Sequence, residues 1–259
     1  MAIYVISPIV ESEAIKLKDS QEFMDKHFPD LNPDHKEPYI KCVFLDKGPT
    51  SVENEIDDAI SVPGLLEKAL WAVEQDAEGI LVDCMCDPGV KALRTALNIP
   101  VIGPAETAFH LAATLGHRFG VVDIGNDTAP MVEDLVARYG LRDKFAALHG
   151  TGIAVEHIGN NTKTQNALYE AALRAVKQDH ADVIVLGCTG FAGMAEYIQK
   201  RLLQEEKYEV PVIDPLTLAV RTLISIVKEK LCHSKKAYPT PAPKGLKGYD
   251  LATLYKIMK

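Results

Sequence analysis

Short apolar runs alternate with amphipathic stretches along most of the chain. The runs are rich in Val, Ile and aromatic residues, and several are apolar throughout, which is typical of strands buried on both faces of a parallel sheet. They predict strands at Ala2–Ser7, Tyr39–Leu45, Gly79–Asp83, Ile99–Gly103, Phe119–Ile124, Ala154–Ile158 and Val183–Gly187. The stretches between them predict helices at Leu65–Gln75, Val90–Leu97, Thr107–Leu115, Met131–Tyr139, Thr164–Gln178 and Met194–Leu203. Regular alternation of strand and helix indicates an α/β fold with parallel sheets.

One sequence of elements occurs twice. A strand, Cys84, a Gly/Pro turn and a helix lead to Pro100-Val-Ile-Gly-Pro104, and the same order around Cys188 leads to Pro211-Val-Ile-Asp-Pro215. This echo predicts two similar α/β lobes related by a pseudo-twofold axis. We place the first lobe at 1–103 plus 213–259 and the second at 104–212. The lysine-rich end of the chain, beyond His233, is expected to form an extended arm of the first lobe, closing with a short helix.

Both repeated cysteines follow a predicted strand and precede a predicted helix. Open α/β sheets bind ligands at this edge, so Cys84 and Cys188 are expected to share a cleft between the lobes. A helix N-terminus would lower the thiol pKa, most clearly at Cys188, where the amides of Thr189 and Gly190 could hold an oxygen atom. A buried structural cysteine is the alternative for either thiol alone, and the matched pair favours a functional role.

Acidic residues flank the first cysteine. Asp83 and Asp87 would raise the pKa of a thiol at Cys84 and so oppose the helix dipole. Asp87, which is followed by Pro88, also has the residue type and position of an N-cap for the next helix.

Composition narrows the possible partners. The 259 residues are 47% hydrophobic and 25% charged, as in an ordinary globular protein, and the net charge of -8 disfavours nucleic-acid binding. No apolar run approaches the length of a membrane-spanning helix, and the N-terminus lacks a basic signal region. We therefore expect a cytoplasmic protein without membrane contact, and its five cysteines to remain outside a disulfide framework.

The sequence lacks several common cofactor and catalytic motifs. It contains no GxGxxG, GxxxxGK[ST] or GxSxG pattern, which disfavours nicotinamide, P-loop and α/β-hydrolase chemistry. The histidines form no HExxH pair, and the single Cys84-x-Cys86 is a weak zinc signal. We expect no metal site.

Five segments carry a family resemblance. They are Cys84–Gly89, Pro100–Glu106, Phe119–Val122, Val185–Gly190 with Met194, and Pro211–Pro215. Through them, between about residues 79 and 227, the chain resembles the aspartate/glutamate/hydantoin racemase superfamily, and most of all its hydantoin racemase branch. The resemblance implies two Rossmann-like lobes, a small-molecule substrate, no cofactor and a homo-oligomer.

The resemblance also implies a two-base mechanism. Cys84 and Cys188 would be the catalytic residues: one thiolate removes a proton next to a carbonyl, and the opposite thiol returns one to the other face. The substrate would be a hydantoin-like ring or an amino-acid derivative. By position in the family motifs and in the expected cleft, we predict that Ser7, Pro8, Met85, Asp123, Thr189 and Gly190 bind it.

The chain departs from the family pattern at three places. Ser7-Pro8-Ile9-Val10 stands where the hydantoin branch has Asn-Pro-Asn and hydroxyl residues, Asp123-Ile124-Gly125 replaces threonines, and Met85-Cys86 replaces the Asn-Thr of amino-acid racemases. The acids at 83, 87 and 123 are expected to surround the site and to favour a neutral or cationic ligand over a dicarboxylate. An Arg or Lys pointing into the site would contradict this.

Three alternatives stay open. A maleate-type cis–trans isomerase also uses two cysteines, one of which would add to an alkene carbon. An arylmalonate-type decarboxylase has one cysteine, in the second lobe, so the pair disfavours it. A non-catalytic protein could use Cys84 and Cys86 as a thiol switch.

Overall fold

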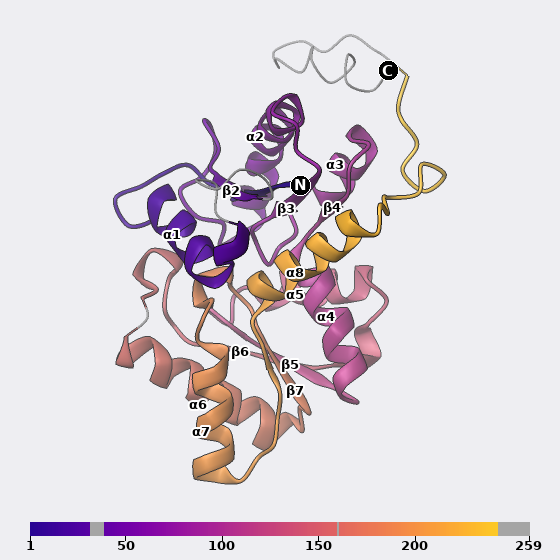
Figure 1. Ribbon diagram of the computed structural model, residues 1–259. Helices are drawn as coiled ribbons and strands as arrows, with labels where there is room; N and C mark the ends of the chain where they lie inside the picture. The colour runs from indigo at the N-terminus through magenta and orange to yellow at the C-terminus, as the bar shows by residue number, and fades with distance from the viewer. Residues whose placement is uncertain (32–38, 160, 243–259) are drawn as a thin grey trace.

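Two parallel sheets of four strands form the framework of the protein (Figure 1). The computed structural model describes residues 1–31, 39–159 and 161–242. The strand orders are β2-β1-β3-β4 and β6-β5-β7-β8, so the second sheet repeats the topology of the first. The strands are β1 (Ala2–Ile6), β2 (Tyr39–Val43), β3 (Gly79–Val82), β4 (Val101–Ile102), β5 (Phe119–Asp123), β6 (Phe145–Gly150), β7 (Val183–Leu186) and β8 (Val212–Ile213). The predicted α/β class with two similar lobes is confirmed.

Helices cover the faces of both sheets. They are α1 (Leu17–His27), α2 (Glu55–Glu74), α3 (Val90–Ala96), α4 (Pro104–Leu115), α5 (Ala129–Arg138), α6 (Thr162–Asp179), α7 (Ala195–Glu206) and α8 (Pro215–Lys228). Short 3-10 helices lie at Pro29–Leu31, Arg142–Lys144, Val155–His157 and Thr189–Phe191. Among the residues described, no helix is both long and apolar enough to cross a membrane.

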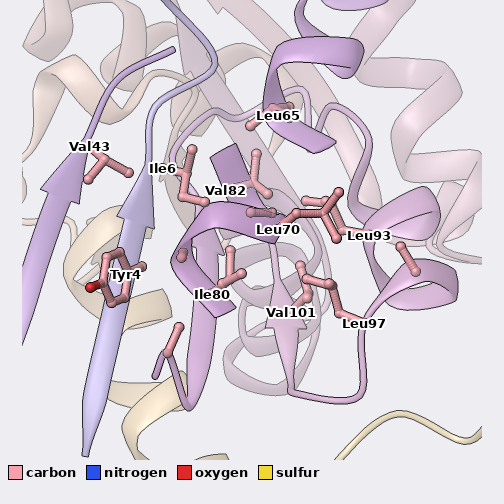
Figure 2. Packing of buried hydrophobic residues seen from close by; sticks show 14 of the residues in the cluster. Tyr4, Ile6, Val43, Leu65, Leu70, Ile80, Val82, Leu93, Leu97 and Val101 are labelled. Atoms are coloured by element: carbon pink, nitrogen blue, oxygen red, sulfur yellow. The ribbon is translucent and has the colours of Figure 1, made fainter. Parts of the chain in front are cut away.

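Each sheet packs against apolar clusters on both of its faces. Figure 2 shows the core of the first lobe, where Ile80 and Val82 of β3 meet Leu65 and Leu70 of α2 and Leu93 of α3. A second core joins the other sheet to α6 and α7. Because burying one such aliphatic side chain contributes about 1.5–3 kcal/mol, these contacts hold the carboxyl ends of the strands in fixed positions.

The two crossover helices connect the lobes. Helix α4 leaves β4 of the first sheet and packs on β5 and β7 of the second, whereas α8 leaves β8 of the second sheet and packs on β3 and β4 of the first. The two helices also pack against each other. This exchange is the basis on which we propose the lobe boundaries 1–103 plus 213–259 and 104–212.

One predicted strand was wrong. Residues 154–158 contain the 3-10 helix Val155–His157, and the strand that follows β5 is β6, at Phe145–Gly150. The error has a physical reason: Val155 and Ile158 are apolar because they line a cavity, not because they lie in a sheet. Strand β6 is an edge strand with half-buried residues, so its sequence lacks a continuous run of strong strand formers. Helix α1 was missed altogether.

The predicted N-cap at Asp87 was also wrong. Helix α3 begins after Gly89, which adopts a left-handed conformation with φ 64°. The Asp87 carboxylate instead caps α4, since it accepts hydrogen bonds from the amides of Ala105 (3.1 Å) and Glu106 (2.9 Å). It also accepts one from the Tyr139 hydroxyl at 2.6 Å. Asp87 therefore joins the Cys84 loop to the crossover helix.

The difference between the two Pro-Val-Ile-(Gly/Asp)-Pro segments follows from this cap. A Cβ atom on Gly103 would lie 2.1 Å from Asp87 Oδ1, so only glycine leaves room for the carboxylate. At the matching position of the second lobe, Asp214 is itself the N-cap of α8 and accepts from the amides of Leu216 and Thr217. Each crossover helix thus has an aspartate cap, supplied from a different part of the chain.

The segment after α8 returns to the first lobe. His233 Nε2 accepts the Val101 amide at 2.7 Å, and burial lowers the His233 pKa to about 4, so the ring is neutral. Lys235 Nζ donates to the carbonyls of Leu97 (2.6 Å) and Arg94 (3.2 Å) at the end of α3. The predicted arm is docked at least as far as Tyr238, whose hydroxyl accepts from Arg94 at 3.3 Å. The predicted terminal helix lies outside the described residues.

Lys235→Met should lower the free energy of unfolding by about 1–2 kcal/mol, because the carbonyls at the end of α3 lose a charged donor. Lys236→Met is the matched control, since Lys236 is exposed, and it should change stability by less than about 0.5 kcal/mol. Chemical denaturation of both variants measures the difference. Equal stability of the two would show that the Lys235 contacts contribute nothing.

Candidate active site

One cavity of about 370 Å³ opens between the carboxyl edges of the two sheets. Its lining includes every residue that the sequence predicted for the site: Ser7, Pro8, Cys84, Met85, Asp123, Cys188, Thr189 and Gly190. These residues end or follow the central strands of the two sheets, which are β1 and β3 in the first sheet and β5 and β7 in the second. The topology therefore gathers residues from four separate parts of the sequence around one space.

The two matched cysteines each sit in a turn just beyond a central strand. Cys84 follows β3 and Cys188 follows β7, and negative charge on Cys188 raises the pKa of Cys84, as expected for thiols facing one cavity. Cys86 lines the same cavity and forms a hydrogen bond with the Cys84 side chain. The cavity thus holds three thiols, all of them free.

The predicted lowering of the Cys188 pKa was wrong, and the pKa of Cys84, for which the sequence left the direction open, is raised as well. The hydrogen bond from Cys86 and burial raise the pKa of Cys84 well above its usual value. Burial and the charge of Asp123 raise the pKa of Cys188, and the Gly190 amide offsets this only in part. The reason is local: Cys188 precedes a single 3-10 turn, and α3 begins only at Val90, so neither sulfur lies at the end of a long helix dipole.

Asp83 and Asp123 line the cavity, and Asp19 and Glu53 also belong to its lining. Asp123 Oδ1 accepts the Ile124 amide at 2.8 Å and Oδ2 accepts the Thr128 hydroxyl at 2.6 Å, while burial raises its pKa to about 6. Asp83 accepts the Ser7 hydroxyl at 3.0 Å.

The third predicted acid lies elsewhere. Asp87, expected beside the cavity, is buried at the start of α4 and does not line it. Lys16 also lines the cavity, and it is an exposed residue. The lining therefore includes a lysine as well as acids.

Apolar side chains form much of the remaining wall, and the sequence reasoning missed them. They come from segments without a recognisable motif: Ile9, Ile15, Phe23, Met24, Phe44, Met131, Val132, Val155, Ile158 and Leu216. Ile158 approaches the cysteine turn closely, since a Cβ on Gly190 would lie 3.1 Å from its Cδ1. Among the described residues, no group of three or more His, Cys, Asp or Glu side chains could hold a metal ion.

Asp123→Asn should change the pH dependence of stability. Folding raises the pKa of Asp123 from 3.8 to about 6, so the folded state favours the protonated carboxyl group. The stabilisation that results is fully present below pH 3.8 and is lost as pH rises through 6. Relative to the wild type, the free energy of unfolding of the variant should therefore increase by about 3 kcal/mol between pH 4 and pH 7. Urea denaturation across this range measures the gain, and a constant difference between the two proteins would show that Asp123 is ionised throughout.

Comparison with known proteins gives consistent matches. The family model described as Asp/Glu/Hydantoin racemase matches residues 22–223. A hydantoin racemase of Pseudomonas sp. (strain NS671) is 33% identical over 79% of this chain and 81% of its own. The structure is similar to the allantoin racemases of Klebsiella pneumoniae (31% identity, TM-score 0.83, 98% of both chains) and Pseudomonas fluorescens (28% identity, TM-score 0.81, 96% and 100% of the chains).

Proposed function

Since the chain belongs to the Asp/Glu/hydantoin racemase family and is a racemase, we propose that it inverts a stereocentre next to a carbonyl in a hydantoin-like or amino-acid-derived molecule, without a cofactor. The observation that carries this proposal is the cavity in which a cysteine directly beyond a central strand of one lobe, Cys84, meets its counterpart from the other lobe, Cys188. Removal and return of a proton on opposite faces of a planar carbon requires two bases on opposite sides, and a cleft between related lobes supplies them.

Cys84 and Cys188 perform the two proton transfers. Because their pKa values are raised, both sulfurs rest mainly as thiols near neutral pH, and the small thiolate fraction is a strong base. Proton removal from one face leaves an enolate, whose oxygen the Thr189 amide stabilises as part of an oxyanion hole, while the Gly190 amide donates to the Cys188 sulfur. The opposite thiol then donates its proton to the other face, so each turnover exchanges the roles of the two sulfurs.

A neutral ring is the substrate that suits the cavity. Asp123 lies in the wall and, ionised at neutral pH, would repel a carboxylate of the substrate, whereas Ser7 and the backbone offer neutral polar groups. Hydantoins also enolise more readily than free amino acids, which reduces the stabilisation that the site must supply. The apolar wall around Phe23, Met24 and Ile158 accepts the substituent at the stereocentre.

Proton NMR in deuterated buffer tests the proposal. The enzyme is incubated with pure enantiomers of substituted hydantoins, allantoin, amino acids and N-acyl amino acids. We expect the stereocentre signal of a cyclic substrate to disappear together with its optical rotation. If no member of the panel exchanges, the proposed substrate class is wrong.

We further propose that the enzyme works in the cytoplasm as a homo-oligomer. Five free thiols, three of them around the substrate cavity, suit a reducing compartment. Light scattering of the purified protein measures the assembly, and a single-chain mass at micromolar concentration would contradict it.

A further inference from the structure

Asp83 occupies a special place between the two cysteine turns. It directly follows β3 and directly precedes Cys84, and its amide donates to the Ile6 carbonyl at 2.9 Å. Its Oδ2 atom accepts the Ser7 hydroxyl of the same lobe at 3.0 Å. From the other lobe, Thr189, the residue directly after Cys188, lines the same cavity, and its hydroxyl acts to lower the pKa of this carboxyl group. Asp83 therefore lies in the cavity with the turns that carry both cysteines.

The second oxygen of this carboxyl group is not satisfied. Asp83 Oδ1 is buried and, among the residues that the structure describes, has no hydrogen-bond partner of good geometry. An ionised carboxylate can only accept hydrogen bonds, so a charged oxygen buried without a donor would cost several kcal/mol. A protonated carboxyl group carries an O–H on that oxygen, and the Thr189 hydroxyl is a suitable acceptor.

The surroundings of Asp83 also favour the protonated form. Asp83 interacts electrostatically with three titratable groups, and all three are acids. They are Asp214 at the start of α8, Cys188 beyond β7 and Cys42 in β2. Burial raises the pKa of Asp83 and the charge of Asp214 adds to this, while the Thr189 and Ser7 hydroxyls oppose it. An ionised Asp83 would in turn raise the pKa of Cys188 and make its thiolate harder to form.

We propose that Asp83 is a positioning residue: as a neutral carboxylic acid it accepts from Ser7, donates to Thr189, and so holds the turns of Cys84 and Cys188 opposite each other. The inference rests on the proposed function, in which these two thiols exchange protons with the substrate. Asp83 itself does not take part in the proton transfers. Its ionisation at high pH breaks the link between the lobes and adds a negative charge beside Cys188.

Substitutions at both ends of the link test this role. Asp83→Ala should lower kcat about tenfold or more and change KM less than about threefold, because a lost link misplaces the thiols more than it weakens binding. Asp83→Asn keeps one acceptor and one donor without a charge, and should recover most of that loss. It should also shift the decline of activity at high pH to a higher pH, where only the thiols titrate. Thr189→Val should reproduce the defect, and Thr189→Ser should relieve it.

Infrared spectroscopy of the resting enzyme gives a second readout that needs no catalysis. The difference spectrum between wild type and Asp83→Asn at neutral pH should contain the C=O band of a protonated carboxyl group. Absence of that band, or a folded Asp83→Asn that is as impaired as Asp83→Ala, would overturn the proposal. Full activity of Asp83→Ala would overturn it too. If Asp83→Ala does not fold, the activities of Asp83→Asn, Thr189→Val and Thr189→Ser test the proposal.

Failure of the proposed function is distinguishable from failure of this inference. If the proposed function is wrong, racemisation survives the loss of Cys84 or Cys188. The infrared band, by contrast, reports only the protonation of Asp83.

Discussion

Replacing either Cys84 or Cys188 with alanine should lower the rate of racemisation about a thousandfold or more, because each turnover needs a base on one face and an acid on the other. The loss should appear in kcat, with KM changed little, since the thiols act on the transferred proton more than on the bound ring. Polarimetry with each pure enantiomer measures the rates. Combining the two substitutions should add little, because either one already breaks the cycle.

Cys232→Ala is the matched control for the thiol substitutions. Cys232 is exposed at the other end of the first lobe and lies outside the cavity, so its replacement should leave kcat unchanged. Cys86→Ala separates the third thiol of the cavity from the pair: it should change the pH at which Cys84 ionises but preserve racemisation. Activity in Cys84→Ala or Cys188→Ala close to that of Cys232→Ala would contradict the assignment.

The largest effect on stability is expected from Asp87→Ala. The substitution removes one carboxylate that accepts three hydrogen bonds and leaves the Ala105 and Glu106 amides and the Tyr139 hydroxyl without a partner. Unsatisfied buried groups and a lost helix cap together should cost about 3–5 kcal/mol, or a melting temperature lower by roughly 10 °C. Differential scanning calorimetry measures the shift.

Two further variants identify the source of that loss. Tyr139→Phe removes one of the three donors and should cost about 1 kcal/mol. Gly103→Ala leaves Asp87 in place but puts a methyl group 2.1 Å from its Oδ1 atom, so it should displace the same cap. A melting temperature of Gly103→Ala equal to that of the wild type would show that the cap contributes little to stability.

The sequence was sufficient to predict the two-lobed fold and the residues that gather around one cavity. Apolar runs such as those at Val183 and Gly79 have few other interpretations, and the repeated cysteine segments indicated which strand ends face each other. The prediction failed where similar local patterns have different environments. Val155 and Ile158 are apolar because they line the cavity, whereas Phe145–Gly150 is a strand at the edge of a sheet with half-buried side chains.

Electrostatics and long-range partners could not be predicted in the same way. The pKa of Cys188 depends on burial between two lobes, which no local pattern records, and this outweighs the effect of its short helical turn. Asp87 looked like the cap of the next helix because the partners that hold it, Ala105 and Tyr139, are distant in sequence. The positioning role of Asp83 rests on its buried Oδ1 atom, which lacks a hydrogen-bond partner among the described residues, and no sequence pattern records this.

Deuterium incorporation into each pure enantiomer by the two cysteine variants is the most direct test of a two-thiol racemase. A variant with one thiol left can still remove and replace a proton on that thiol's face. Cys84→Ala should therefore exchange one enantiomer of the substrate, Cys188→Ala should exchange the other, and neither should produce the mirror-image product. Exchange of both enantiomers by either variant would contradict the assignment of one thiol to each face.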